Sequence, residues 1–387
     1  MDPVQRRAVR NGIVAFAVTA LIGFGINALV IRGDEAAGRR ASSTGPPSAS
    51  PTCTSTWEPV DTVDPDRSGS QLVAVTALSP SDVWAVGSTG DPQEPSNTLV
   101  EHWDGNRWRR VDTPNGGTMG NALVAVDGTG RKDAWAVGSA SDGAGYQPLI
   151  LHWDGSTWET ALAPNLLGGA ELSGVIALSP TDAWAVGHRG DPTVGSDRAL
   201  VLHWNGSNWT EAQIEASGGR SSLVAVDGTA ADDLWAVGYH QKRSAIMHGD
   251  GKRWRWVDLK PRGRLLDVTV AAPDQVWAVG SSILRWNGSR WKPGGTIGST
   301  AELNAVSEPS TAGLWAVGDR VAGKKTRAIV RRFDGTRWSS VEGSGVPGSE
   351  SLGGVSALPD GVAWGVGYRE TKGGRRTLAA RMVLTCR

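Results

Sequence analysis

Short runs of small and apolar residues alternate with polar turns along most of the chain, and one pattern recurs within them. Trp84-Ala85-Val86-Gly87 reappears as WAVG or WGVG at six later positions: Trp135, Trp184, Trp235, Trp277, Trp315 and Trp364. The successive spacings are 51, 49, 51, 42, 38 and 49 residues. Trp-containing repeats of this length are typical of β-propellers, with one four-stranded blade per repeat. The pattern therefore predicts an all-β, seven-bladed propeller.

A single repeat, residues 72–111, contains four short apolar segments that we interpret as strands, at 72–77, 83–87, 99–103 and 106–111. Asp104-Gly105 separates the last two segments, and Asp-Gly favours a two-residue hairpin turn. Such a turn would make Trp103 and Trp108 diagonal neighbours on one face of the sheet. The residues thus predict a meander of four antiparallel strands.

Tryptophan follows the repeat closely, because 18 of the 19 tryptophans fall in the second, third or fourth segment of a repeat. Blades splay apart away from the axis of a propeller, so the outer strands need bulky side chains to fill the space between them. We interpret these tryptophans as packing residues rather than as a carbohydrate platform.

The two ends of the repeat region complement each other. The last repeat supplies only three segments, 353–358, 362–367 and 377–384, whereas 53–60, which contains Trp57, reads as an isolated fourth strand. We expect this N-terminal strand to complete the last blade and to remove its open edge. In that register Cys53 and Cys386 fall close together, which predicts a disulfide; the alternative is two unrelated free thiols.

The first 52 residues differ in composition from the repeats. Residues 12–31 are uncharged and follow three arginines, so we predict a transmembrane helix behind a cytoplasmic segment, residues 1–11. A cleaved signal peptide is the alternative. Residues 32–52 form a Ser/Pro/Gly-rich linker expected to be disordered, and residues 53–387 form the propeller. The expected location is the cell membrane, with a single crossing and an extracytoplasmic propeller.

Composition excludes several functions. Lys plus Arg equals Asp plus Glu at 39 each, so no overall charge favours nucleic acid. His102, His152, His203 and His248 occupy equivalent positions in different repeats, so we interpret them as partly exposed strand residues that cannot share a metal ion. The aspartates two residues before each WAVG (Asp82, Asp133, Asp182 and Asp233) are interpreted as turn residues that accept backbone N–H bonds.

The full repeat, L-x-A-V-x-x-x-S-P-x-D-x-W-A-V-G followed by L-x-x-H-W-D-G-x-x-W, resembles bacterial propellers of the galactose-oxidase/kelch superfamily. The resemblance implies the propeller architecture. It would also imply a copper site built from Tyr, His and a Cys–Tyr cross-link, but the chain has three tyrosines and no cysteine inside a blade. We therefore predict no cofactor, no metal and no catalytic residues.

A local group of basic residues lies in the second loops of the sixth and seventh repeats, which are adjacent in the ring. We predict a membrane-anchored, non-catalytic binding or assembly module for a protein or an anionic envelope polymer. The alternative is an extracytoplasmic hydrolase or lyase acting on glycans or small molecules at the propeller axis. The candidate binding residues are Arg320, Lys324, Lys325, Arg327, Arg369, Lys372, Arg375 and Arg376.

Overall fold

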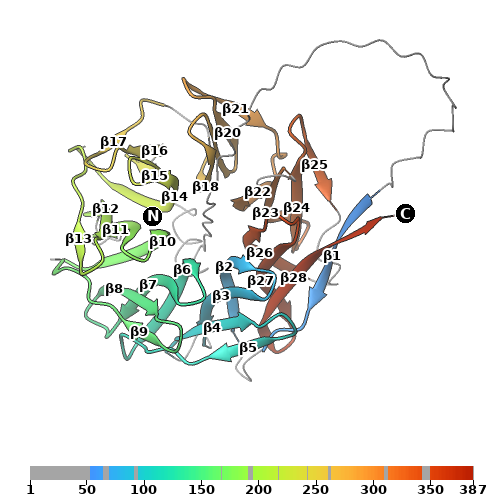
Figure 1. Cartoon of the computed structure of the whole chain (residues 1–387), viewed down its shortest axis with the longest axis horizontal. Helices are drawn as coiled ribbons and strands as arrows, with labels where there is room; N and C mark the ends of the chain where they lie inside the picture. Colours follow the sequence, from blue (N-terminus) through green and yellow to red (C-terminus); the bar gives the residue numbers. More distant parts are fainter. Residues whose placement is uncertain are drawn as a thin grey trace, which may run out of the picture.

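The repeats fold into seven four-stranded antiparallel sheets around one centre, which confirms the predicted all-β, seven-bladed propeller (Figure 1). In six blades the strands follow chain order from the centre outward, beginning with β2, β6, β10, β14, β18 and β22. The seventh has the order β26-β27-β28-β1, so its outermost strand comes from the other end of the propeller sequence.

This computed structural model describes residues 53–63, 69–90, 95–166, 168–190, 195–216, 218–241, 243–259, 263–308, 313–341 and 349–386. Within these ranges no helix has the length and apolar character needed to cross a membrane. The predicted transmembrane segment 12–31 and linker 32–52 lie outside the described residues.

The first four blades have the following strands. Blade 1 consists of β2 (Gln71–Ser79), β3 (Asp82–Thr89), β4 (Asn97–Trp103) and β5 (Trp108–Val111). Blade 2 consists of β6 (Gly120–Gly130), β7 (Asp133–Ser141), β8 (Tyr146–Trp153) and β9 (Trp158–Thr160). Blade 3 consists of β10 (Ala170–Ser179), β11 (Asp182–Arg189), β12 (Arg198–Trp204) and β13 (Trp209–Glu211). Blade 4 consists of β14 (Ser221–Ala230), β15 (Asp233–His240), β16 (Arg243–Gly249) and β17 (Trp254–Trp256).

The remaining three blades complete the ring. Blade 5 consists of β18 (Leu265–Ala272), β19 (Gln275–Gly280), β20 (Ile283–Trp286) and β21 (Trp291–Gly295). Blade 6 consists of β22 (Ala301–Ser307), β23 (Leu314–Ala322), β24 (Lys325–Phe333) and β25 (Trp338–Val341). Blade 7 consists of β26 (Ser349–Ala357), β27 (Ala363–Thr371), β28 (Gly374–Cys386) and β1 (Cys53–Val60).

A steric constraint explains why each WAVG or WGVG ends in glycine. A Cβ atom on Gly87 would lie 1.9 Å from the backbone oxygen of Gln71 on the neighbouring inner strand. The six equivalent glycines would meet a backbone oxygen at 1.9 to 2.1 Å. Each inner strand is irregular at the same place, since the register shifts by one residue between Leu72 and Ala74 and at the matching position of every other blade. Only glycine allows the two inner strands to approach this closely.

Tryptophan pairs connect every blade to the next. The WAVG tryptophan of each blade packs against the fourth-strand tryptophan of the following blade, with ring centroids 5.1 to 5.9 Å apart and ring planes 60 to 89° apart. These angles are close to the edge-to-face geometry that aromatic pairs prefer. The pairs are Trp84–Trp158, Trp135–Trp209, Trp184–Trp254, Trp235–Trp291, Trp277–Trp338, Trp315–Trp57 and Trp364–Trp108.

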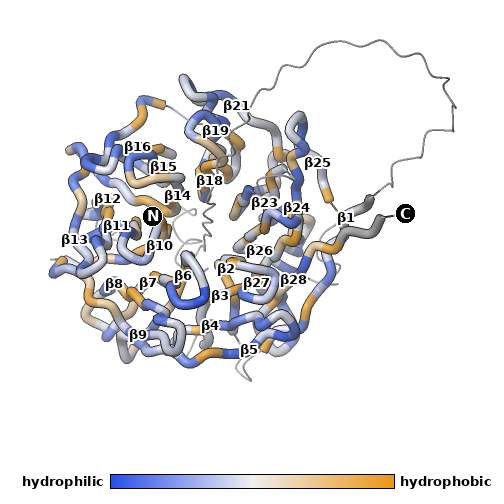
Figure 2. The backbone as a smooth tube through the Cα atoms, in the orientation of Figure 1, coloured by the Kyte–Doolittle hydropathy of each residue, from blue (hydrophilic) through white to orange (hydrophobic). Residues whose placement is uncertain are grey.

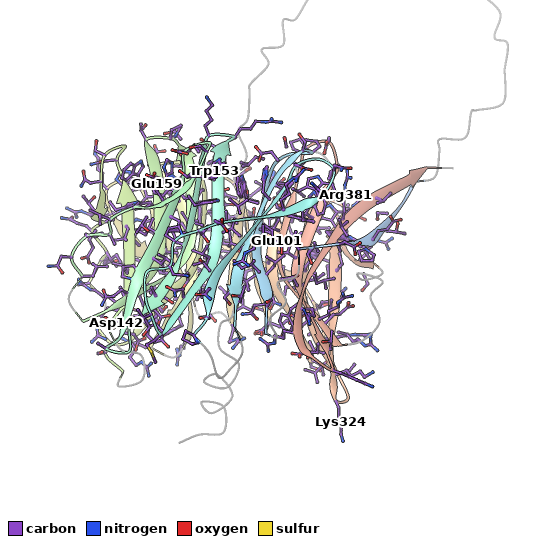
Figure 3. All side chains as sticks on the ribbon, turned by 90° about the horizontal axis from the view of Figure 1, so that it is seen from below. Glu101, Asp142, Trp153, Glu159, Lys324 and Arg381 are labelled. Carbon is purple, nitrogen blue, oxygen red and sulfur yellow. The ribbon has the colours of Figure 1, made fainter. Side chains whose placement is uncertain are left out.

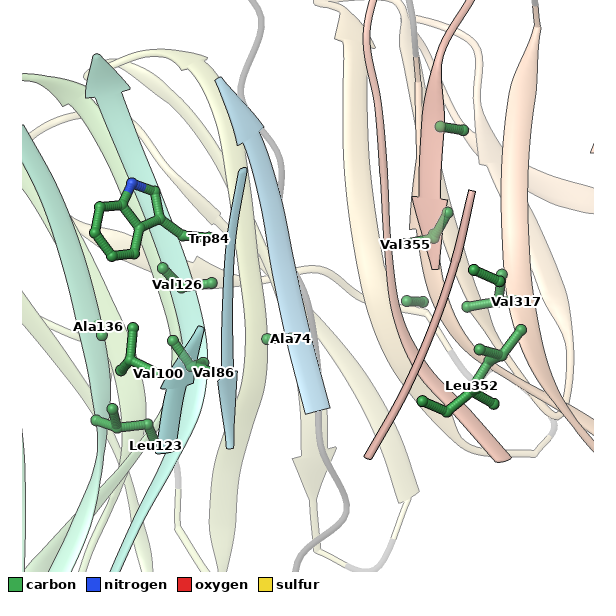
Figure 4. Close-up of a cluster of buried hydrophobic side chains, with 14 of the residues drawn as sticks. Ala74, Trp84, Val86, Val100, Leu123, Val126, Ala136, Val317, Leu352 and Val355 are labelled. Carbon is green, nitrogen blue, oxygen red and sulfur yellow. The ribbon is translucent and has the colours of Figure 1, made fainter. Parts of the chain in front are cut away.

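The hydrophobic core is correspondingly distributed around the ring, and Figure 2 shows hydrophobic stretches in strands of all its parts. Figure 4 shows one cluster, in which Trp84 and Val100 of blade 1 lie near Leu123 and Ala136 of blade 2. All four side chains are buried. Each blade therefore buries its faces against its neighbours, as expected for a repeat architecture.

The turn between the third and fourth strands differs from the predicted two-residue hairpin. Trp103 pairs directly with Trp108, so the loop has four residues and the two tryptophans are not diagonal neighbours. Oδ1 of Asp104 accepts the N–H groups of Asn106 and Arg107 at 2.9 and 3.0 Å, and Gly105 has a φ of 95°. The prediction was wrong because the side chain of the first turn residue caps a longer loop.

The predicted closure of the ring is confirmed. β1 pairs with β28 along its whole length, and Trp57 lies opposite Met382. The same register places the Cα atom of Cys53 opposite that of Cys386. Residues directly opposite in an antiparallel pair have Cα atoms about 4.5 to 5.5 Å apart, within the range of about 4.4 to 6.8 Å that a disulfide spans.

We predict a Cys53–Cys386 disulfide on the basis of this register. Denatured, unreduced protein should then show no reactive thiol, and reduced protein should show two. Replacing both cysteines by serine should lower the free energy of unfolding by roughly 5 kcal/mol in the chain-entropy model, since the bond closes a very long loop. Stoichiometric thiol labelling without reductant would contradict the disulfide.

Trp57 completes the ring of tryptophan pairs, so Trp57→Ala should lower the free energy of unfolding by about 3 to 5 kcal/mol. Trp256→Ala is the matched control, because the described aromatic contacts of Trp256 include only His240. Chemical denaturation of the two variants would measure the difference. Equal losses would mean that closure does not depend on Trp57.

Candidate functional site

The eight predicted binding residues come from two hairpins of adjacent blades, β23–β24 in blade 6 and β27–β28 in blade 7. Lys324 projects from one end of the disk, where Asp142 of blade 2 also lies, whereas Trp153 and Glu159 lie toward the other end (Figure 3). The second loops of these blades therefore share one face. We call the following set the basic hairpins: Arg320, Lys324, Lys325, Arg327, Arg369, Lys372, Arg375 and Arg376.

Both hairpins pair like charges across their strands. Arg320 lies directly opposite Arg327 in blade 6, and Arg369 lies directly opposite Arg376 in blade 7. Like charges in this position destabilise a sheet, because the side chains lie within about 5.5 Å of each other at Cβ. Blade 6 thus holds an arrangement that costs stability, whereas in blade 7 Arg369 also lies opposite Glu350 of β26.

Arg375 differs from the rest of the basic hairpins. Its guanidinium bonds Glu370 at 3.0 Å and Oε1 of Gln71 at 2.9 Å, and it stacks 4.2 Å from the ring of Tyr368. Gln71 belongs to blade 1, so this arginine connects two blades. Arg375 therefore also helps to hold blade 7 against blade 1.

Asp319 lies at the base of the blade 6 hairpin, next to Arg320 in sequence. Its Oδ2 atom accepts hydrogen bonds from Asn304 Nδ2 at 3.1 Å and from Ser351 Oγ of blade 7 at 2.8 Å. Burial raises the pKa of this carboxyl to about 6. The contact joins the two blades that carry the basic hairpins, so it fixes the hairpins relative to each other.

Charge is unevenly distributed around the ring although the whole chain is neutral. Residues 263–387, which include blades 5 to 7 without β1, carry 17 Lys and Arg against 10 Asp and Glu. Residues 53–262 carry 16 against 26. Such a distribution steers charged partners toward one sector even in a molecule without net charge.

A His–Asp pair lies in each of the first four blades. In blade 1, His102 Nε2 lies 2.7 Å from Asp82 Oδ1, and the imidazole packs 4.2 Å from the ring of Trp84. Three further blades repeat this with Nε2–Oδ1 distances of 2.8 to 3.0 Å: His152 with Asp133, His203 with Asp182, and His248 with Asp233. Interpreting these aspartates as turn residues that accept backbone N–H groups missed this bond, in which each carboxylate contacts the histidine of the next strand in sequence.

The last three blades replace both members of this pair. Arg285, Arg332 and Arg381 occupy the histidine position and lie 5.2 to 5.7 Å from the centroid of the adjacent tryptophan ring. The aspartate position is then Gln275, Gly313 or Val362. Cation–π contact replaces the ion pair in blades 5 to 7. Among the described residues, no group of three or more His, Cys, Asp or Glu side chains is arranged to hold a metal ion.

Hydrogen bonds between inner strands form a second connection between blades that the sequence interpretation missed. The carboxylates of Asp127, Asp227 and Asp267 each accept a backbone N–H from the next blade at 2.8 to 2.9 Å. Ser307 and Ser356 do the same at the next two boundaries. The signal was present in the repeat itself, since Asp127, Asp227, Ser307 and Ser356 share the position opposite a WAVG or WGVG tryptophan.

Burial raises the pKa of all three inner carboxyls, to about 7 for Asp127 and well above the usual range for Asp227 and Asp267. In the unfolded chain Asp127 titrates near 3.8. Below that pH both states are protonated, and above about 7 both are ionised, so the cost of the buried charge develops between these values.

Stability should therefore fall as pH rises from about 4 to 7, by on the order of 4 kcal/mol for Asp127 alone. Asp127→Asn should flatten this dependence, measured as the denaturation midpoint at several pH values. Asp104→Asn is the control, because Asp104 lies in a surface turn, only partly buried, and its pKa is lowered by Arg109 and the turn N–H groups. If the stability of Asp127→Asn depended on pH as steeply as that of the parent, the raised pKa of Asp127 would be contradicted.

A further polar cluster joins blades 3 and 4. At this boundary the position opposite the WAVG tryptophan holds Ile176 rather than an aspartate or serine. The fully buried Asp197 accepts hydrogen bonds from the Tyr239 hydroxyl and, at 2.7 Å, from Arg220 Nε. Although burial alone would raise it, these bonds hold the pKa of Asp197 below its usual value. Both carboxylate oxygens are occupied, so the cluster acts as a clamp between blades.

Comparison with known proteins supports the fold. No protein-family model matches the chain, and no curated protein matches it. Among solved structures, YCF48 bound to a D1 peptide has a TM-score of 0.54 at 16% identity, covering 84% of this chain and 94% of that one. A GH74 xyloglucanase from Xanthomonas campestris has a TM-score of 0.51 at 14% identity, covering 82% and 54%. A PL25 ulvan lyase bound to its saccharide has a TM-score of 0.51 at 11% identity, covering 80% and 93%.

These neighbours include both a peptide-bound protein and glycan-active enzymes. At such identities the likeness extends to the propeller fold and no further. The expected likeness to the galactose-oxidase/kelch superfamily is supported only as far as this fold, because the neighbours named here belong to other groups.

Proposed function

We propose that this propeller is a non-catalytic binding or assembly module whose basic hairpins contact an acidic protein partner. The cross-strand pair Arg320–Arg327 of blade 6 carries the proposal. A sheet gains nothing from such a pair by itself, whereas an acidic partner placed between the two arginines would turn repulsion into attraction.

The surroundings of the basic hairpins support this partner chemistry. The excess of basic residues in blades 5 to 7 would orient an acidic partner before contact and raise its association rate. Asp319 and Arg375 join neighbouring blades beneath the hairpins, so the binding surface rests on rigid sheets. A solved structure of YCF48, which shares the fold, contains a bound peptide, and a peptide or protein ligand is consistent with that example.

The proposal includes attachment to the cell membrane through residues 12–31, with the propeller on the extracytoplasmic side. The uncharged stretch and the arginines before it motivate this part. A glycan-directed hydrolase or lyase remains the alternative class, and the fold is compatible with it.

Charge reversal tests the binding face. A variant with Arg320, Lys324, Arg369 and Lys372 changed to Glu should bind a fluorescein-labelled, glutamate-rich 12-residue peptide at least tenfold more weakly than the parent. The reason is that each lost contact to a carboxylate removes a charge-assisted bond. Fluorescence anisotropy at low and physiological salt would measure the affinity, and the parent should show the steeper salt dependence.

The matched control reverses four exposed basic residues in turns outside the basic hairpins: Arg107, Lys132, Lys252 and Arg290. This variant should bind like the parent. Equal loss in both variants would show a general charge effect and contradict the proposed face. Binding of anionic vesicles but not of the peptide would contradict an acidic protein partner.

A further inference from the structure

A hollow lies at the outer boundary between blades 5 and 6, away from the basic hairpins. Its volume is about 420 Å³, within the range of small-molecule pockets. One wall is a glycine-rich segment of blade 5, and the other comes from β24, the following turn and Trp338 of blade 6. We call it the blade 5–6 groove. The residues that matter for its chemistry are Gly294, Gly295, Arg331, Phe333, Arg337 and Trp338.

Arg331 occupies a position at which five of the other six blades have an apolar side chain. It lies opposite Ala316, the residue after the WAVG tryptophan. The residues at the same position in the other six blades are Glu101, Leu151, Leu202, Met247, Leu284 and Ala380. Leu151, Leu202 and Met247 are fully buried there. Blade 6 therefore places a half-buried guanidinium where its neighbours place an apolar side chain.

No interaction inside the described part of the chain accounts for this arginine. No described acid or hydrogen-bond acceptor pairs with the Arg331 guanidinium. The nearby acid of the turn, Asp334, accepts hydrogen bonds from Thr336 and from the backbone N–H of Arg337, and its Oδ2 atom lies 3.8 Å from Arg337 Nε. A half-buried cation without a partner is costly, which points to a ligand that supplies the charge.

Part of the opposite wall lacks side chains for a steric reason. A Cβ atom on Gly294 would lie 2.9 Å from the ring of Trp277, and one on Gly295 would lie 2.7 Å from the ring of Trp338. The third strand also carries Phe333 where four other blades carry tryptophan. Backbone on one side and a smaller ring on the other leave room for a ligand.

We propose that the blade 5–6 groove binds a small carboxylate-bearing ligand. The Arg331 guanidinium receives the carboxylate, Arg337 adds a second positive charge at the rim, and Phe333 and Trp338 contact the apolar or ring-shaped body. Arginine suits this role because its planar fork matches a carboxylate with two parallel hydrogen bonds. The site is independent of the acidic partner proposed for the basic hairpins.

Ligand titrations of the full-length chain test the groove. Sodium glucuronate and the dipeptide N-acetyl-alanyl-phenylalanine are the carboxylate probes, and glucose and the dipeptide amide are their neutral counterparts. At least one carboxylate should raise the Tm and change tryptophan fluorescence, while its neutral counterpart should not. A preference for glucuronate assigns the site to acidic sugars, and a preference for the dipeptide assigns it to peptide C-termini. No effect of either carboxylate up to 10 mM would overturn the proposal.

Variants separate the groove from non-specific charge. Arg331→Leu restores the residue found in blades 2 and 3, so it should match or exceed the parental Tm and weaken carboxylate binding at least tenfold. Arg331→Gln keeps a polar side chain but removes the charge, and it should show the same loss if the leucine variant folds poorly. Arg290→Leu, in an exposed turn of blade 5, should bind like the parent. Full binding by Arg331→Gln would overturn the proposal, and full binding by the basic-hairpin variant would confirm that the two sites are separate.

Discussion

The contact between one blade and the next is the constraint on which the structure depends. Each boundary joins the WAVG tryptophan of one blade to the fourth-strand tryptophan of the next, and Trp57 supplies the last of these partners from the N-terminal strand. Edge-to-face indoles fill the space that opens as the blades splay outward. Near the axis the opposite requirement holds, so a glycine ends each WAVG or WGVG where the two inner strands approach each other. The repeat is thus a consequence of the wedge shape of a blade.

A closed ring with this internal support can vary its loops and individual strand positions at little cost. The His–Asp pair shows how far such variation goes, since blades 5 to 7 exchange both members together and place an arginine on the tryptophan instead. Replacing only one member would leave a half-buried charge without a partner. The exchange also removes acidic residues from the sector that carries the basic hairpins, so a packing change within the repeat contributes to the charge distribution of the whole disk.

The architecture could be predicted from the sequence because its determinants repeat. Trp57 in an isolated strand pattern was sufficient to predict the closure of the ring, since seven fourth strands were needed and six hairpins were present. The turn at Asp104 was predicted wrongly because Asp-Gly suits both a two-residue turn and a side-chain-capped longer loop, and only the pairing of Trp103 with Trp108 distinguishes them. The His102–Asp82 bond was missed because each residue was interpreted alone, although both recur at the same spacing.

The candidate sites were predictable to different degrees for a related reason. Charge is visible in sequence, so the basic hairpins could be proposed, but the cross-strand pairing of Arg320 with Arg327 required the register. Arg331 carries no motif and becomes unusual only when its position is compared with Leu151 and Leu202. In a repeat protein the other blades supply the expected residue at each position, and a departure that costs stability needs a cause. Where the ring itself offers no compensating partner, that cause is most simply sought in a ligand, and the hollow beside Arg331 gives such a ligand room.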